Sequence, residues 1–148
     1  LGDRFEEVVA TGSPSAHPDY AACDSHSGYL FTLSRGGMAT TTVDYLRPEA
    51  APTHGDERIR MAGTKGVVEI STGYGTGTLI DASGVTELET KPAVPWYAQF
   101  LLAATGQGDV TPLHAQWEMF RATEVALKAQ RALDTGKPVS LKDSPYHR

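Results

Sequence analysis

Residues 58–71 read RIRMAGTKGVVEIS, and this stretch decides the fold class. Charged and apolar residues alternate over 58–62 (RIRMA) and again over 67–71 (VVEIS). Alternation with a period of two puts one set of side chains on each face of a sheet. Gly63-Thr64-Lys65-Gly66 lies between the two segments and has the composition of a hairpin turn. The stretch therefore predicts two antiparallel strands joined by a short turn.

Further strand-like runs lie on both sides of this hairpin. Tyr29–Leu33 (YLFTL) and Met38–Leu46 (MATTTVDYL) flank Ser34-Arg35-Gly36-Gly37, where glycine supplies the positive φ that a tight turn needs. A similar pair of runs surrounds Asp81-Ala82-Ser83-Gly84. This pair consists of residues 78–80 and 85–88, and the other segments predicted to be extended are 5–12 and 20–23. Successive hairpins of this kind predict a mainly antiparallel sheet.

The character of the chain changes after Pro95. Trp96–Ala104 (WYAQFLLAA) has the spacing of a helix. Thr111-Pro112 begins a second helix, because Thr is a good N-cap and Pro suits the first turn, and Gly136 and Pro138 end it. The apolar stripe of this helix, with Trp117 and Phe120 expected in the core, comprises Leu113, Trp117, Phe120, Ala122, Val125, Ala126, Ala129 and Leu133.

Strands that come first and helices that come later indicate an α+β fold. We expect an open, mainly antiparallel sheet with helices packed on one face, and one domain over residues 1–148. Val139–Leu141 could add a short final strand. Because helices cover only one face of such a sheet, an uncovered apolar face would be an interface with another domain or another copy of the chain.

Composition excludes several classes of function. The net charge of -5 and the absence of a basic stripe argue against nucleic acid as a partner. No apolar run approaches the roughly 18–20 residues of a membrane span. The single cysteine, Cys23, rules out an internal disulfide and is compatible with a cytoplasmic location, which we expect. The chain begins with Leu1 and not Met, so we interpret it as part of a longer protein, although a processed N-terminus would look the same.

Two motifs with a familiar appearance have simpler explanations. Gly73-Tyr74-Gly75-Thr76-Gly77 resembles a nucleotide-binding loop, but that motif needs a helix after it and more strand follows here. Cys23 and His26 have a metal-like spacing and His17 is near, yet a structural zinc site needs four ligands and no second pair is evident. A nucleophilic Cys–His pair would also need a group that orients the histidine, and none is evident. We therefore assign no metal ligand and no cofactor-binding residue to these motifs, and no catalytic residue.

Two places could help to form a substrate pocket. The proline-bearing loop 48–55 is either a solvated turn or a pocket wall, with Tyr45, Arg47 and His54 directed at polar hydroxyl groups. Trp96 and Tyr97 begin a helix and either pack against the sheet or contact a sugar ring or a partner, since each joins an apolar body to a polar tip.

A longer run of the sequence resembles a known family. GMATTTVDYLRPE (37–49), HGDERIRMAGTKGVVEI (54–70) and FRATEVALKAQRALDTGKPV (120–139) are similar to the C-terminal domain of the glucose–fructose oxidoreductase / inositol dehydrogenase / MocA (Gfo/Idh/MocA) family. Members usually carry an N-terminal Rossmann domain, a Glu-Lys-Pro segment with the catalytic lysine, and a helix with an Asp and a His. This chain has no match to any of these three features. Lys91-Pro92 is not the Glu-Lys-Pro segment, because Thr90 precedes it and it lies downstream of the sheet.

The resemblance implies a domain that shapes the substrate pocket and pairs subunits through the open sheet face. The parent protein would be an oxidoreductase that uses NAD or NADP on a sugar, polyol or related hydroxyl compound, with the cofactor on its own Rossmann domain. The isolated chain is then expected to bind no cofactor and to be inactive. Two alternatives remain at this point: a non-catalytic β-sheet dimerisation module and a small carbohydrate-binding protein.

Overall fold

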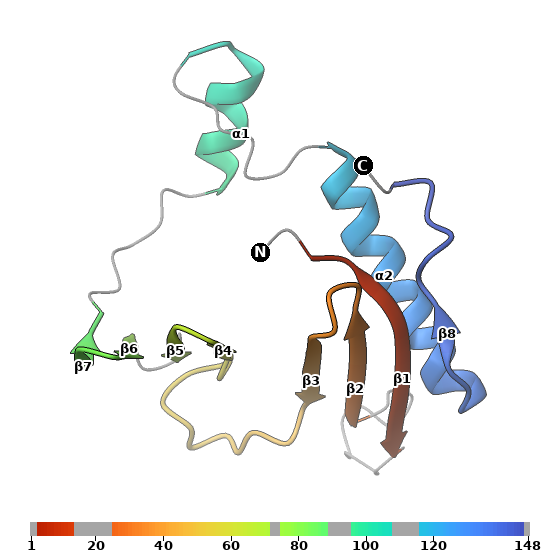
Figure 1. Ribbon diagram of the computed structural model, residues 1–148, viewed down its shortest axis with the longest axis horizontal. Helices are drawn as coiled ribbons and strands as arrows, with labels where there is room; N and C mark the ends of the chain where they lie inside the picture. The colour runs from red at the N-terminus through yellow and green to blue at the C-terminus, as the bar shows by residue number, and fades with distance from the viewer. Residues whose placement is uncertain (1–2, 14–24, 72–74, 89–95, 108–115, 147–148) are drawn as a thin grey trace. The chain divides into compact units, whose positions relative to one another are not determined.

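The computed structural model describes residues 3–13, 25–71, 75–88, 96–107 and 116–146 (Figure 1). The chain divides into two compact units, the first formed by residues 1–46 with 111–148 and the second by residues 47–110. The expectation of one domain over the whole chain stays a prediction.

The first unit contains a four-stranded antiparallel sheet. Its strands are β1 (Phe5–Ser13), β2 (His26–Leu33), β3 (Met38–Asp44) and β8 (Val139–Ser140), in the order β3-β2-β1-β8. Strands β2 and β3 form the expected hairpin. Gly36 in their turn has a φ of 84°, the left-handed conformation that glycine adopts without a steric penalty.

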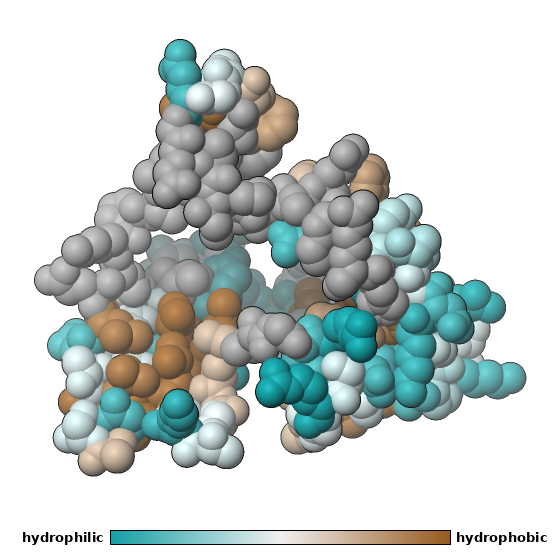
Figure 2. Space-filling model, turned by 45° about the horizontal axis from the view of Figure 1, so that its top comes forward, coloured by the Kyte–Doolittle hydropathy of each residue, from teal (hydrophilic) through white to brown (hydrophobic). Residues whose placement is uncertain are grey.

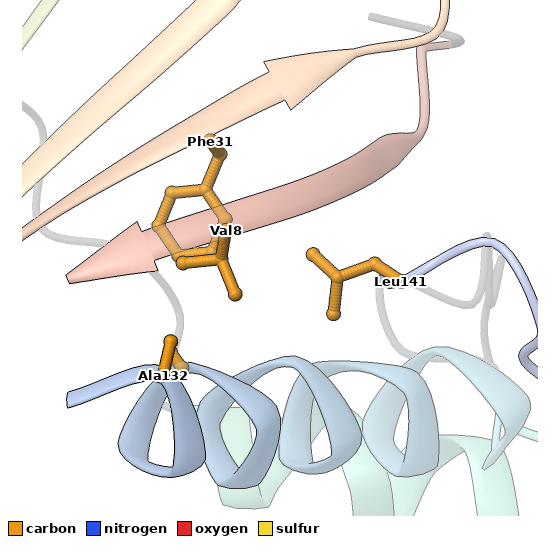
Figure 3. Close-up of a cluster of buried hydrophobic side chains, with 5 residues drawn as sticks. Val8, Phe31, Ala132 and Leu141 are labelled. Atoms are coloured by element: carbon orange, nitrogen blue, oxygen red, sulfur yellow. The ribbon is translucent and has the colours of Figure 1, made fainter. Parts of the chain in front are cut away.

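Helix α2 (Gln116–Thr135) packs on β1 and β8 and closes the core of this unit (Figures 1 and 3). Val8 and Phe31 point from the strands toward the helix, and Ala132 faces them. Leu141, directly after β8, is fully buried in the same cluster. The helix presents the small residues Ala129 and Ala132 at the contact, so its backbone can approach the sheet closely. The predicted helix end is confirmed, because α2 stops at Thr135 and Gly136 follows with a φ of 62°.

One core assignment from the sequence is wrong. Phe120 is half exposed, and its ring stacks on Tyr146 with 5.5 Å between ring centroids. The helix contacts the strands further along its length, through Ala129 and Ala132. Phe120 therefore packs on the segment after β8 and not on the sheet. The side chain of Trp117, the segments 20–23 and 111–115, and the cysteine Cys23 lie outside the described residues.

The second unit contains an antiparallel meander followed by a helix. Its strands are β4 (Arg58–Gly63), β5 (Gly66–Ser71), β6 (Thr76–Asp81) and β7 (Gly84–Glu87), in chain order across the sheet. The predicted hairpin of residues 58–71 is confirmed, with Gly63 opposite Gly66 at its turn. Helix α1 covers Trp96–Ala104, as its spacing predicts.

The α+β class with a mainly antiparallel sheet is therefore confirmed. Within the described residues the strands are distributed over two four-stranded sheets, which we call the first sheet (β3-β2-β1-β8) and the second sheet (β4-β5-β6-β7). Among these residues, no helix has the length and apolar character that crossing a membrane requires.

Candidate functional site

The second sheet has two chemically different faces. Residues directly opposite each other in an antiparallel pair point to the same face. The register pairs Ile59 with Ile70, Met61 with Val68, and Val68 with Leu79. These five residues form the apolar face, and Ile59 and Met61 are 48% and 44% exposed. Figure 2 shows hydrophobic side chains gathered over this sheet, at the lower left. An exposed apolar group of this kind indicates an interaction surface.

The opposite face, which we call the polar face, carries two rows of hydrogen-bonding side chains beside one apolar row, Ala62–Val67–Ile80–Val85. One row runs Arg58–Ser71–Thr76 across β4, β5 and β6. The next row runs Arg60–Glu69–Thr78 and continues to Glu87 on β7. The first six residues of the two hydrogen-bonding rows line a shallow depression of about 510 Å³, which we call the hollow.

Ion pairs neutralise the two arginines of the hollow. Arg60 Nε donates to Glu69 Oε1 at 3.0 Å. Arg58 forms a two-pronged contact with Asp56, from Nε to Oδ1 at 3.1 Å and from Nη2 to Oδ2 at 2.8 Å. The hydrogen bonds from Arg58 hold the pKa of Asp56 below its usual value. The hollow therefore presents both donors and acceptors without an excess of positive charge.

The floor of the hollow contains an unsatisfied group. The hydroxyl oxygen of Ser71 is buried and has no hydrogen-bond partner among the residues that the structure describes. A buried hydroxyl without a partner costs on the order of 1–3 kcal/mol. Such a group is uncommon in a folded protein.

The loop that leads into β4 is closed on itself by Arg47. Its Nε donates to the carbonyl of Thr53, and its Nη2 donates to the Thr53 hydroxyl, both at 2.7 Å. That hydroxyl in turn donates to the carbonyl of Gly55 at 2.6 Å. Arg47 Nη1 also lies 3.3 Å from Asp56 Oδ2. Asp56 binds both Arg47 and Arg58, and it therefore links the loop to the rim of the hollow.

Comparison with known proteins places this architecture. No protein-family model matches the chain, and neither does any curated protein sequence. Among solved structures, a Thermotoga maritima protein described as an oxidoreductase is 33% identical, with a TM-score of 0.85 over 94% of this chain and 41% of its own. The aldose–aldose oxidoreductase of Caulobacter crescentus, solved with glycerol, is 19% identical, with a TM-score of 0.71 over 94% of this chain and 42% of its own. An Agrobacterium radiobacter oxidoreductase, solved with NAD+, L-tartaric acid and magnesium, is 17% identical, with a TM-score of 0.72 over 96% of this chain and 44% of its own.

The chain thus spans less than half the length of each of these oxidoreductases. The antiparallel strands, the hairpin at 58–71 and the closing helix agree with the resemblance read from the sequence. The chain is a C-terminal sheet domain of the Gfo/Idh/MocA type.

The residues predicted to line a substrate pocket belong to different elements of this Gfo/Idh/MocA-type domain. Tyr45 is half exposed just after β3 in the first unit. Arg47 and His54 share one loop of the second unit, where His54 is exposed and Arg47 is engaged within the loop. Tyr97 is 57% exposed on α1 and stacks on Phe100, with ring centroids 6.4 Å apart. The side chain of Trp96 lies outside the described residues. Their role at a pocket stays a prediction.

Neither of the two excluded motifs gains support. Gly75 has a φ of 64° and leads directly into β6, so strand follows this loop as expected. In the described part of the chain, no group of three or more His, Cys, Asp or Glu side chains could hold a metal ion. His17 and Cys23 lie outside that part, and the prediction of no metal site stays a prediction.

The hollow was not found from the sequence, although the domain carries a signal for it. Arg58, Arg60 and Glu69 stand at alternate positions of two predicted strands and therefore share a face once the strands pair. The partners on β6 follow a link of unknown geometry, so the register that adds Thr76 and Thr78 could not be assigned from the residues alone.

Proposed function

We propose that this domain is the sheet-bearing part of an NAD(P)-dependent oxidoreductase that acts on a sugar, a polyol or a related hydroxyl compound. The observation that carries the proposal is the 33% identity and 0.85 TM-score shared with the Thermotoga maritima protein over nearly the whole chain. Hydride transfer needs a nicotinamide cofactor held by a dedicated fold, and the described residues here form antiparallel sheets with no phosphate-binding turn. An N-terminal Rossmann domain of the same protein would supply that site, and we expect the protein to act in the cytoplasm.

The loop 47–57, which leads into β4, is proposed as a wall of the substrate pocket. Arg47, Thr53 and Asp56 hold the loop in one shape, which leaves His54 exposed and able to contact a hydroxyl group. Tyr45 and the Trp96-Tyr97 pair are further candidates for contact with a substrate. We assign none of them to proton transfer.

The decisive experiment uses the full-length protein. We expect reduction of NAD or NADP, measured at 340 nm, with at least one member of a panel of sugars and polyols. His54→Ala is expected to raise KM more than it lowers kcat, because a wall residue binds ground state and transition state alike. Glu49→Ala, a change at an exposed position of the same loop, serves as the control. Failure of the full-length protein to turn over either cofactor with any member would contradict the proposal.

The 148-residue chain alone tests whether the cofactor site lies on another domain. Calorimetric titration with NAD or NADP is expected to give no more than background heat. Tight, stoichiometric binding of a dinucleotide would place a cofactor site on this domain and would overturn the assignment of that site to another domain.

The apolar face of the second sheet is proposed as the surface that pairs two copies of the protein. Ile59 and Met61 are exposed there, and burying such side chains would contribute favourably to association. Met61→Lys is expected to convert a dimer to a monomer in sedimentation. Ala62→Lys is the matched control, because the neighbouring residue on β4 points to the polar face. A dimer that survives Met61→Lys would exclude this face as the contact.

A further inference from the structure

After β8 the chain turns back onto helix α2. Leu141 is fully buried in the core of the first unit, and its amide donates to the carbonyl of Glu6 at 2.8 Å. The residues that follow it, 142–146, are exposed or half-buried. The anchored part of the chain therefore ends at Leu141, and the segment 142–146, which we call the strap, lies on the surface of the first unit.

Two residues of the strap contact α2. The hydroxyl of Ser144 donates a hydrogen bond to Oε2 of Glu124. The ring of Tyr146 stacks on Phe120, with 5.5 Å between the ring centroids and 25° between the ring planes. Among the described residues, these two contacts connect the strap to the helix.

A short turn holds both strap residues in register with the helix. Phe120 and Glu124 are four residues apart on α2, so they share one face and lie about 6 Å apart along its axis. Pro145 and Tyr146 lie in a turn, and the amide of Tyr146 donates to the Ser144 hydroxyl at 3.1 Å. Proline suits such a turn because its φ is fixed. The sequence Ser-Pro-Tyr thus arranges a hydroxyl donor and an aromatic ring side by side.

The helix face under the strap is held in place by other contacts. The carboxylate of Glu124 also receives Arg121 Nη1 at 2.8 Å and Lys128 Nζ at 3.0 Å. Arg121 in turn donates to the carbonyls of Phe5 and Leu141, which belong to the anchored part of the first unit. Departure of the strap would therefore leave the carboxylate with both cationic partners and the face preformed.

The strap covers only part of this face. Phe120 stays 49% exposed beneath Tyr146, and the neighbouring Met119 is 59% exposed. An occupant with more apolar surface beside its turn would bury more of these side chains and would displace the strap. Because the strap is joined to the core at Leu141, it competes at a high effective concentration and lowers the apparent affinity of any such occupant.

We infer that the strap is an autoinhibitory occupant of a peptide-docking site on α2. The site, formed by Phe120 and Glu124, takes a turn of a partner protein in which a proline separates a hydroxyl residue from an aromatic residue. Opening of the strap exposes the site while Leu141 and the core stay in place. The inference concerns the first unit alone and does not depend on the oxidoreductase proposal.

The test compares two forms of the 148-residue chain as hosts for a synthetic peptide. Ser144→Ala combined with Tyr146→Ala removes both contacts of the strap and gives the opened form. The probe is the peptide KDSPYHR, the sequence of residues 142–148, added up to about 10 mM because two contacts support only a millimolar dissociation constant. ¹H–¹⁵N NMR follows the amides of residues 118–128, and the amides of β1 and β2 report that the core stays folded.

We expect saturable shifts of residues 118–128 in both forms. Binding to the opened form is expected to be at least about fivefold tighter, because the strap no longer competes for the site. A merely structural tail would give no such difference between the two forms.

Substitutions on both sides connect the binding to the two contacts. Peptides with alanine in place of the serine or the tyrosine are expected to bind at least about fivefold more weakly to either form. In the opened form, Glu124→Gln and Phe120→Ala are expected to weaken binding of the original peptide similarly. Gln130→Ala, at an exposed position further along the same helix, is the control and is expected to leave binding unchanged.

Four results would overturn the inference. The first three are the absence of saturable shifts in both forms, equal affinity of the two forms for the peptide, and equal binding of the original and the alanine-substituted peptides. The fourth is association of the opened form with the unsubstituted chain in sedimentation, with Met61→Lys in both chains to remove the sheet contact proposed above. That association would make a second copy of the strap the occupant in place of a partner protein.

Discussion

The hydroxyl of Ser144 donates a hydrogen bond to Oε2 of Glu124, and this contact ties the segment after β8 to the middle of α2. The same carboxylate receives Arg121 Nη1 at 2.8 Å and Lys128 Nζ at 3.0 Å. Arg121 also donates from Nη2 to the carbonyls of Phe5 and Leu141. The carboxylate of Glu124 thus lies at the junction of the helix, the first strand and the final segment.

This junction predicts a specific loss of stability in acid. Burial alone would raise the pKa of Glu124, but hydrogen bonds from Ser144, Lys128 and Arg121 outweigh it and lower the pKa from 4.5 to about 2. Because the folded-state pKa is the lower one, the stabilisation is complete above pH 4.5 and is lost as pH falls from 4.5 toward 2. Its size is on the order of 2–3 kcal/mol.

Urea unfolding at pH 7, 4.5 and 2.5 measures this effect. Glu124→Gln is expected to remove most of the decrease in unfolding free energy between pH 4.5 and 2.5, and Ser144→Ala to remove part of it. Glu7→Gln, at an exposed carboxylate of β1, is expected to keep the decrease. An acid dependence that is identical in Glu124→Gln and the unsubstituted chain would contradict the prediction.

The core of the first unit predicts a strong asymmetry between two leucines. Leu141 is fully buried against Val8 and Ala132, whereas Leu127 on α2 is 67% exposed. Leu141→Ala is expected to lower the unfolding free energy by about 2–5 kcal/mol, because it removes buried methyl groups and leaves a cavity. Leu127→Ala is expected to change it by less than about 0.5 kcal/mol. Equal effects in chemical denaturation would show that this core is not the one that stabilises the unit.

The hairpin of residues 58–71 contains a matched pair of glycines. A Cβ atom at Gly66 would lie 2.5 Å from the backbone carbonyl oxygen of Ile80, whereas one at Gly63 would meet nothing within 4 Å. Gly66→Ala is therefore expected to strain the pairing of β5 with β6 and to destabilise the second sheet by about 1–3 kcal/mol. Gly63→Ala is expected to be close to neutral. Hydrogen exchange of the β5 and β6 amides distinguishes the two, and equal protection in both variants would refute the close approach.

The loop before β4 offers a test of its closure by Arg47. Thr53→Val removes the hydroxyl that accepts from Arg47 Nη2 and donates to the carbonyl of Gly55. We expect amide exchange of residues 53–56 to become about tenfold faster or more, because the substitution removes two hydrogen bonds. Thr42→Val on the exposed side of β3 in the first unit is the control. Unchanged exchange in Thr53→Val would mean that the loop is held by other contacts.

Much of the fold could be predicted because its signals are local. Alternation over 58–62 and 67–71 specifies two strands whatever surrounds them, and the helix of Trp96–Ala104 follows from its own spacing. The exposure of Phe120 could not be predicted, because an aromatic residue on an apolar stripe is buried only where a sheet meets the helix. The alanines of α2 meet the strands instead, and alanine carries little signal in a sequence.

The candidate site was less accessible to sequence reasoning. Arg47 was predicted to face a substrate, which stays a prediction, and the structure adds that its guanidinium donates to Thr53, six residues further along the chain. Nothing in the residue types distinguishes an arginine that closes its own loop from one that reaches a ligand. The hollow requires Arg60, Glu69 and Thr78. Each is 9 residues from the next along the chain, and they share a row only because three strands pair.

The sequence by itself determined which segments are strands and helices, and which side chains of each strand share a face, because the period of two is a property of the extended backbone. The tertiary structure alone decided which strands are neighbours, which helix residues meet the sheet, and which polar side chains combine into one hollow. Those relationships depend on register and on packing between distant segments, and neither is encoded in any short stretch of residues.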